Sequence, residues 1–133
     1  MDVSGVYLEL YGRIPPLVER AVKDLTPDQL TQLPADGTNP IGWLVWHLAR
    51  VQDHHVAELI DGPQIWERGD WAARFGLTPD PANIGYGHRP ADVAAVRPDD
   101  PDSLLRYLDA VQARTVDYLR TLDDAALDRI VDR

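Results

Sequence analysis

The chain has 133 residues, of which 44% are hydrophobic and 26% charged, and this composition indicates one globular domain. The lack of cysteine excludes disulfides, thiolate metal sites and a cysteine nucleophile, and the net charge of −9 argues against binding to nucleic acid or to a membrane surface. The sequence has no apolar run of about 20 residues that would span a bilayer and no basic signal-peptide region, so we expect a cytoplasmic protein.

The first part of the chain predicts two helices. Apolar residues recur at helical spacing over residues 10–25, and Pro15–Pro16 predict a kink or a restart within this segment. Thr26 and Gln29 have the spacing of a capping box, with a proline between them at the first helical position. We therefore expect a second, short helix over residues 26–33.

A long helix is expected over residues 40–60. Asn39 is a suitable N-cap, Pro40 suits the first helical position, and residues 61–63 (Asp-Gly-Pro) provide a glycine cap and a breaker. Seven residues fall within a wedge of about 100° around this helix, which predicts its core-facing side. They are Ile41, Leu44, Val45, Leu48, Gln52, His55 and Leu59.

Residues 62–100 are the least regular part of the chain. The segment is rich in glycine and proline, and helical pieces are expected only near residues 70–75 and 91–96. Its aromatic residues are Trp66, Trp71, Phe75 and Tyr86. We expect these rings to pack on the helices, and an ordered loop of this kind is typically a lid or a pocket wall.

The last part of the chain predicts a third long helix, capped by Asp100, and a short one over residues 123–130. The expected core face of the long helix is Leu104, Leu108, Val111, Thr115, Tyr118 and Leu122, widened by Leu105, Val116 and Leu119. No segment of the sequence shows the period-two alternation of a strand. The predicted fold class is therefore all-α, a helical bundle.

His47 is the first candidate functional residue. It lies on the flank of the predicted core face, one turn from Trp43 and one turn from Val51. An imidazole in this position is expected to be partly buried and to need a partner, which can be a carbonyl, a carboxylate or a metal ion. Structural hydrogen bonding and metal ligation are therefore both open for His47.

Four further side chains are candidates for binding a small-molecule substrate, and each has a structural alternative. Trp43 and Trp46 either line a ligand pocket or pack against the aromatic segment that follows. Arg50 either binds a substrate carboxylate or thiol cofactor, or forms an ion pair with an acid such as Asp53. His88 either folds back over the pocket or is a turn residue among glycines.

Residues 39–53 read Asn-Pro-Ile-Gly-Trp-Leu-Val-Trp-His-Leu-Ala-Arg-Val-Gln-Asp, and residues 85–88 read Gly-Tyr-Gly-His. Together with the capped helices before them, these segments resemble the DinB-like superfamily. The similarity is greatest to the branch related to thiol transferases and to mycothiol-dependent maleylpyruvate isomerase. The resemblance covers essentially the whole chain, as a single domain over residues 1–133.

The resemblance implies an antiparallel up-down four-helix bundle with a divalent metal ion, zinc or nickel, held at one end. In such proteins the ligands are a histidine of the second helix and two residues, usually histidines four apart, of the last helix. Only the first of these ligands carries over, onto His47. The resemblance further implies a metal-dependent transferase or isomerase that uses a low-molecular-weight thiol; the alternative is a non-catalytic bundle that binds a small ligand or a protein partner.

The chain departs from the family pattern because the fourth long helix is missing from the sequence. The other histidines are His54, His55 and His88. His47 and His54 are about 10.5 Å apart along a helix and cannot share an ion, while His54 with Glu58 has a spacing common on surface helices. These residues supply no complete metal triad.

Three amphipathic helices arranged around a four-helix groove would leave an apolar trough exposed to water. We expect a C-terminal segment beyond Arg133 to cover this trough, the alternative being another chain. Homodimerisation through helix faces is a separate expectation.

Overall fold

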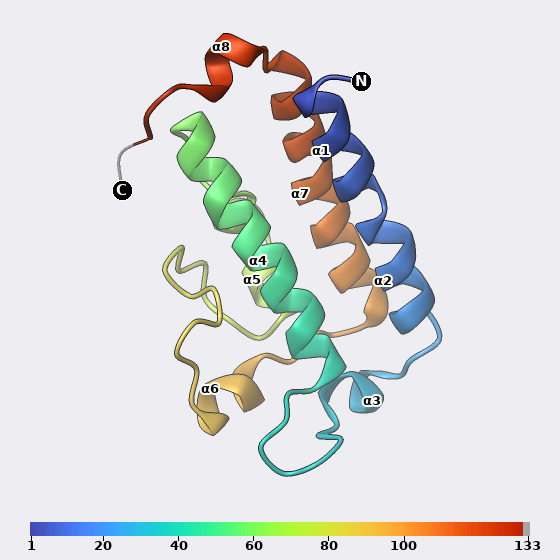
Figure 1. The fold of residues 1–133 in the computed structure, drawn as a ribbon. Helices are drawn as coiled ribbons and strands as arrows, with labels where there is room; N and C mark the ends of the chain where they lie inside the picture. The colour runs from blue at the N-terminus through green and yellow to red at the C-terminus, as the bar shows by residue number, and fades with distance from the viewer. Residues whose placement is uncertain (132–133) are drawn as a thin grey trace.

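The computed structural model describes residues 1–131, and this part of the chain contains helices and no strand. Three long rods make up the body of the molecule (Figure 1): α1 (Val3–Gly12) continued by α2 (Ile14–Val22), then α4 (Ile41–Ile60) and α7 (Pro101–Thr121). The shorter elements are α3 (Pro27–Thr31), the 3₁₀ turn η1 (Ile65–Glu67), α5 (Trp71–Arg74), α6 (Pro90–Ala95) and α8 (Asp124–Leu127). The predicted all-α bundle is confirmed.

The order of the rods differs in one respect from a simple up-down bundle. The rod α1–α2 runs opposite to α4, but α4 and α7 run in the same direction (Figure 1). Two hydrogen bonds between α4 and α7 agree with this direction. Arg50 bonds Tyr107 near the start of α7, and Gln52, which follows Arg50 in α4, bonds Thr115 further along α7. The two rods are parallel because the segment between them crosses back along the length of the molecule.

The first rod begins earlier than predicted and breaks where a break was predicted. The Asp2 carboxylate caps α1 by accepting a hydrogen bond of 2.8 Å from the Gly5 N–H. Helix α1 ends at Gly12, and α2 begins just ahead of Pro15, whose ring and missing N–H are incompatible with a continuous helix.

Helix α3 packs closely on the start of α4. The predicted capping box is present, since Thr26 Oγ1 accepts from Gln29 N at 3.2 Å and Gln29 Oε1 accepts from Thr26 N at 2.9 Å. A Cβ atom at Gly42 would lie 2.6 Å from the Leu30 carbonyl oxygen, so the close approach of the two helices requires a glycine there.

The ends of α4 differ slightly from the prediction. Pro40 is the N-cap residue instead of Asn39, with ψ 153° and no side-chain hydrogen bond, and the helix starts at Ile41. At the other end the left-handed residue is Asp61 (φ 59°) instead of Gly62. Aspartate tolerates this conformation better than most residues, so the helix still ends at Ile60.

The predicted core face of α4 is partly wrong. Leu44 is 49% exposed and His55 is also exposed, whereas Val45 and Gln52 are buried as expected. The most buried side chains lie on the other side of the helix: they are Trp43, Trp46, Ala49, Arg50, Asp53, Val56 and Ala57. This side contacts α7 and the crossing segment, so aromatic and hydrogen-bonded polar groups occupy the place where aliphatic ones were expected.

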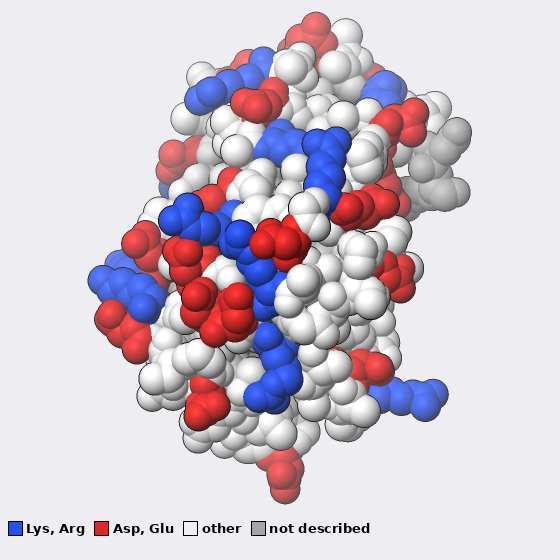
Figure 2. All heavy atoms as spheres, turned by 180° about the vertical axis from the view of Figure 1, so that it is seen from behind, with Lys and Arg blue, Asp and Glu red and all other residues white. Residues whose placement is uncertain are grey.

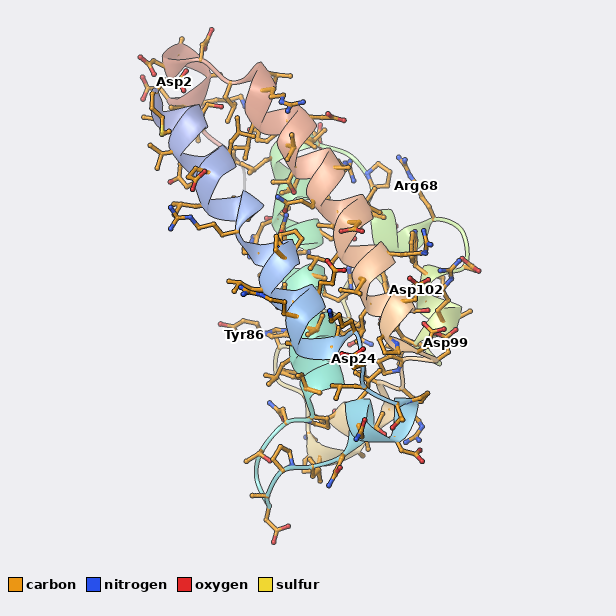
Figure 3. The ribbon with its side chains drawn as sticks, turned by 90° about the vertical axis from the view of Figure 1, so that its right-hand side faces the viewer. Asp2, Asp24, Arg68, Tyr86, Asp99 and Asp102 are labelled. Atoms are coloured by element: carbon orange, nitrogen blue, oxygen red, sulfur yellow. The ribbon has the colours of Figure 1, made fainter. Side chains whose placement is uncertain are left out.

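The crossing segment, residues 62–100, packs mainly through its aromatic rings. Trp66 and Phe75 are completely buried and Trp71 is half-buried, as predicted. The expectation for Tyr86 is wrong: its ring is 86% exposed and points outward from the loop (Figure 3). The turn η1, which positions Trp66, was not predicted.

Helix α7 begins as expected, with the Asp100 carboxylate accepting a 2.9 Å hydrogen bond from Ser103 N. Its buried apolar residues are Leu104, Tyr107, Leu108, Val111 and Leu119. Tyr107 was not among the predicted core residues, and Tyr118 and Leu122 are half-buried. Helix α8 stops at Leu127, so Ile130, which is 90% exposed, lies outside the last short helix.

Apolar side chains remain exposed along the rods, as expected for a three-rod bundle. The exposed members on α1, α2 and α4 are Val3, Val6, Tyr7, Leu10, Leu17, Leu44 and Ile60. At one end a hollow of about 300 Å³ is lined by Tyr7 of α1, Leu59 of α4 and Tyr118 of α7, among others. What covers this surface stays a prediction.

Charged residues of both signs are interspersed on the face opposite to that of Figure 1 (Figure 2). The residues described on this face form no extended basic patch of the kind that binds phosphate backbones. Within residues 1–131, every helix is too short or too polar to cross a lipid bilayer.

Candidate functional site

The loop that contains residues 83–88 lies directly against the first half of α4. Gly85 makes the contact possible: its φ is 98°, and a Cβ atom there would lie 2.5 Å from His47 Nδ1 and 3.0 Å from Trp43 Cζ2. Only a glycine accommodates both this backbone conformation and this distance. The loop therefore forms a wall over His47 and Trp43.

His47 has a carbonyl as its partner. Its Nδ1 atom is hydrogen-bonded to the Ile84 carbonyl oxygen, and its ring stacks on Trp43 with centroids 4.7 Å apart. Because a carbonyl can only accept, Nδ1 carries the proton, and in the neutral ring the lone pair is on Nε2. No hydrogen bond within residues 1–131 engages Nε2, so the lone pair of this atom has no partner among the described residues.

His88 folds back onto α4, but both of its nitrogens are engaged. Trp43 Nε1–H donates to His88 Nδ1 at 3.0 Å, and His88 Nε2 donates to Asn83 Oδ1 at 2.7 Å. The His88 ring also stacks on Trp46, with centroids 5.6 Å apart. Burial lowers the pKa of His88, Asp92 opposes that shift and His47 adds to it. His88 is therefore a neutral ring that fixes the loop.

This arrangement predicts a pH dependence of stability that His88 controls. The lowered pKa means that the unfolded chain takes up a proton on His88 more readily than the folded chain does. Stability from this residue is then complete above the unfolded pKa of about 6.5 and is lost as the pH falls toward the folded value. Urea unfolding between pH 7.5 and pH 5 should show a smaller loss of stability for His88→Gln than for the wild type; equal losses in the two proteins would contradict the prediction.

Arg50 is completely buried, and each of its three guanidinium nitrogens donates a hydrogen bond within the chain. Its Nε donates to the Asn83 carbonyl at 3.0 Å and its Nη2 to the Pro81 carbonyl at 3.2 Å. Its Nη1 donates to Gln64 Oε1 at 2.7 Å, and its guanidinium lies 4.7 Å from the centre of the Trp66 ring. Arg50 thus joins α4 to three parts of the crossing segment.

Asp53 completes this buried network. One carboxylate oxygen lies 3.5 Å from Arg50 Nη1, which confirms the ion pair that was the structural alternative for Arg50. The carboxylate also accepts from the backbone N–H groups of Ile65 and Trp66, both at 2.9 Å, and from the Tyr107 hydroxyl at 2.6 Å. Burial, followed by the charge of Asp53, raises the pKa of Tyr107, while Arg50 acts against that shift, and Tyr107 stays protonated.

Three of the four predicted substrate-binding residues are buried in this conformation. Trp46 and Arg50 are 0% exposed and Trp43 is 7% exposed. Trp46 packs on Trp66 with ring centroids 6.1 Å apart, and its indole N–H has no partner among the described residues. His88 is more accessible and lines a cavity. Substrate contact by these four residues stays a prediction.

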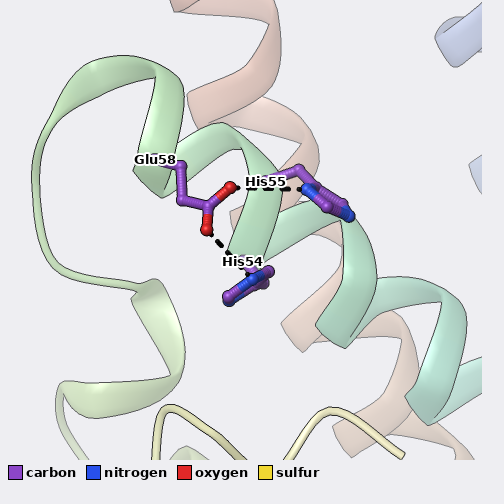
Figure 4. Close-up of side chains that lie close together, drawn as sticks. All are labelled: His54, His55 and Glu58. Carbon is purple, nitrogen blue, oxygen red and sulfur yellow. Dashed lines mark ion pairs between the residues drawn. The ribbon is translucent and has the colours of Figure 1, made fainter. Parts of the chain in front are cut away.

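A second group of possible ligands lies on the outer face of α4, toward its end (Figure 4). The donor atoms of His54, His55 and Glu58 lie within 4.8 Å of one another, so this group could hold a metal ion. Glu58 pairs with His54 Nε2 at 3.2 Å and with His55 Nδ1 at 3.6 Å. The sequence drew attention to the spacing of His54 and Glu58 but not to His55 as a third member.

The proton position on His54 weighs against that group. The Gln64 side-chain oxygen accepts from Arg50, so its amide nitrogen is the atom that donates to the Pro81 carbonyl at 3.0 Å and to His54 Nδ1 at 3.1 Å. With Nδ1 as the acceptor, neutral His54 carries its proton on Nε2, the atom that faces Glu58. Metal ligation through Nε2 would require this bond to Gln64 to be lost.

His47 therefore fits the role of a metal ligand better than His54 does, because its free nitrogen holds a lone pair. The residues described here do not complete a site around it: no group of three histidine or acidic side chains in residues 1–131 includes His47. Of the ligands implied by the resemblance, residues 1–131 contain only His47, and metal binding by His47 stays a prediction.

Comparison with known proteins agrees with the geometry. The DinB superfamily matches residues 11–133. A crystal structure of a conserved protein from Enterococcus faecalis is similar to this chain, with 26% identity and a TM-score of 0.87, over 99% of this chain and 78% of the other. None of the curated proteins matched the sequence. With more than nine-tenths of its length matched, the chain belongs to the DinB superfamily.

Proposed function

We propose that this protein is a metal-dependent enzyme that holds zinc or nickel through His47. The observation that carries the proposal is the state of the His47 ring, in which Nδ1–H is bonded to the Ile84 carbonyl and Nε2 is free. Metal-binding histidines are typically oriented in this way, by a hydrogen bond from the nitrogen that does not touch the metal. Membership of the DinB superfamily supports the same role.

The chain's own residues hold His47 in a fixed orientation. Trp43 stacks on one face of the ring, and Gly85 lets the loop backbone come close enough for the Ile84 carbonyl to accept the proton of Nδ1. A divalent ion held there would lower the pKa of a bound thiol and so supply a nucleophile near neutral pH. We accordingly propose a transferase or isomerase that uses a low-molecular-weight thiol and a small-molecule substrate, in the cytoplasm.

The alternative is a non-catalytic bundle that binds a small ligand or a protein partner. It is favoured by the use of Arg50 and His88 within the chain and by the apolar side chains exposed along the rods. Homodimerisation through these rods is compatible with both proposals, since burying the exposed apolar side chains of two copies against each other would stabilise a dimer.

Metal binding is tested on protein purified without chelator. We expect stoichiometric zinc or nickel by elemental analysis, and a rise in melting temperature when either ion is added to metal-free protein. The rise should vanish in His47→Ala, because the free Nε2 is lost.

Glu58→Gln and His55→Ala are the matched controls, since they dismantle the second group of ligands and leave His47 intact. Both variants should keep the metal-induced rise in melting temperature. If Glu58→Gln abolishes the rise and His47→Ala keeps it, the metal site is the group on the outer face and the proposal is wrong. If no ion stabilises the wild type, the non-catalytic alternative is favoured.

A further inference from the structure

A cavity of about 320 Å³ lies between the loop that leads into α4 and helix α6. Its volume is at the lower end of the range of small-molecule sites, about 300–1,000 Å³. Most of its walls are apolar, and they are formed by Leu33, Pro40, Pro90, Val93 and Val96. These residues make the cavity suitable for the apolar body of a small molecule.

Two polar side chains in the lining are without partners. The Arg97 guanidinium makes no ion pair or hydrogen bond within residues 1–131, although its backbone N–H is fixed by a 3.0 Å bond to the Phe75 carbonyl. The amide of Asn39 is likewise free of hydrogen bonds to the described residues, because Pro40 and not Asn39 caps α4. Both side chains offer N–H donors.

The other polar groups of the lining are already bonded. The Thr38 hydroxyl bonds the backbone of Ala35, the Thr31 hydroxyl bonds the carbonyls of its own helix, and both His88 nitrogens are engaged as described above. Among residues 1–131 no acidic side chain lines the cavity, although the chain as a whole has a net charge of −9. The cavity therefore combines apolar walls with a single cation at its rim.

From this combination we infer that the cavity binds a small molecule with an apolar body and one carboxylate. The carboxylate would lie on Arg97, whose planar fork of N–H groups matches a carboxylate, with the Asn39 amide as a second donor. The apolar body would lie among Val93, Val96 and the prolines. His47 is not among the residues that line this cavity, and the inference does not depend on metal binding by His47.

Hexanoate and hexanamide are suitable probes, since they share the apolar chain and differ in charge. With metal-free, full-length protein, we expect hexanoate to shift the NMR signals of the Val93 and Val96 methyl groups in a saturable manner. Hexanamide should bind about two- to fivefold more weakly, because water partly screens an ion pair to the exposed Arg97. Arg97→Gln should reduce hexanoate binding to the level of hexanamide.

Arg68→Gln is the matched control, because it removes the same charge from an exposed residue outside the cavity lining. It should leave hexanoate binding unchanged. The inference is overturned if hexanoate leaves both valines unperturbed, if the two probes bind equally, or if Arg97→Gln behaves like Arg68→Gln. Arg97 is exposed and forms no ion pair with an acid in the described part of the chain, so Arg97→Gln is expected to fold.

Discussion

Replacing Arg50 with methionine is expected to lower the free energy of unfolding by about 3–5 kcal/mol, the cost of removing one partner of a buried ion pair. The Asp53 carboxylate, only 1% exposed, would keep its charge without a counter-ion. The Asn83 carbonyl would lose its donor at the same time, and the Pro81 carbonyl would keep only the bond from Gln64, which loosens the loop over His47. Urea unfolding followed by circular dichroism measures the loss.

The control is Arg106→Met. Arg106 also pairs with an acid of its own helix, Asp102, at 2.7 Å, but the two side chains are 66% and 62% exposed. Water screens such a pair, so the midpoint of unfolding should stay that of the wild type. If Arg50→Met is no more harmful than Arg106→Met, the buried network does not stabilise the fold in the way inferred here.

Gly85→Ala is expected to detach the loop from α4 and to destabilise the protein by at least about 2 kcal/mol, from backbone strain and overpacking together. The added methyl group would meet His47 Nδ1 and Trp43, and either the loop or the two rings must move. The bond from His47 to the Ile84 carbonyl is then broken, which NMR detects as a change in the His47 ring signals.

Gly87→Ala, two residues along the same loop, separates these two effects. Gly87 also has a positive φ, 72°, but a Cβ atom there would have no heavy atom within 4 Å. In this variant the free energy of unfolding should fall only by the cost of backbone strain, about 1–2 kcal/mol, and the His47 signals should stay those of the wild type. Equal losses in the two variants would show that the contact at His47 is unimportant.

The helices of this protein could largely be predicted from local signals. Asp100 and the pair Thr26 and Gln29 act as caps where expected, and Pro15 ends a helix by its own covalent structure. These signals act within a few residues, so the sequence contains them in full. The start of α1 at Val3 depends on Asp2, a cap that was overlooked.

The face that α4 buries could not be predicted in the same way. Leu44 was expected inside and is half exposed, because aliphatic periodicity does not tell which side of a helix its neighbours will cover. Arg50 and Asp53 look like surface residues in the sequence. They are buried because carbonyls and amides far along the chain, from Ile65 to Asn83, satisfy their hydrogen bonds.

For the candidate site, the sequence predicted the partial burial of His47 but not the groups that surround it. The flank position of His47 indicated partial burial and the need for a partner, and both are observed. The partner itself, the Ile84 carbonyl, lies 37 residues away and is a backbone atom, so no residue type in the sequence marks it. The proton positions on His54 and His88 follow from the same kind of distant contact.

The clustered tryptophans should also make the docking of the crossing segment on α4 measurable by spectroscopy. Trp46 of α4 lies in contact with Trp66 of the crossing segment and with Trp43, at centroid distances of 6.1 Å and 6.3 Å. At such distances indole transitions couple, so the Trp46–Trp66 pair should contribute exciton bands to the circular dichroism spectrum, and these bands require the crossing segment to be docked. Any ligand, ion or substitution that lifts the segment from α4 would then red-shift the emission and weaken those bands, with no label attached.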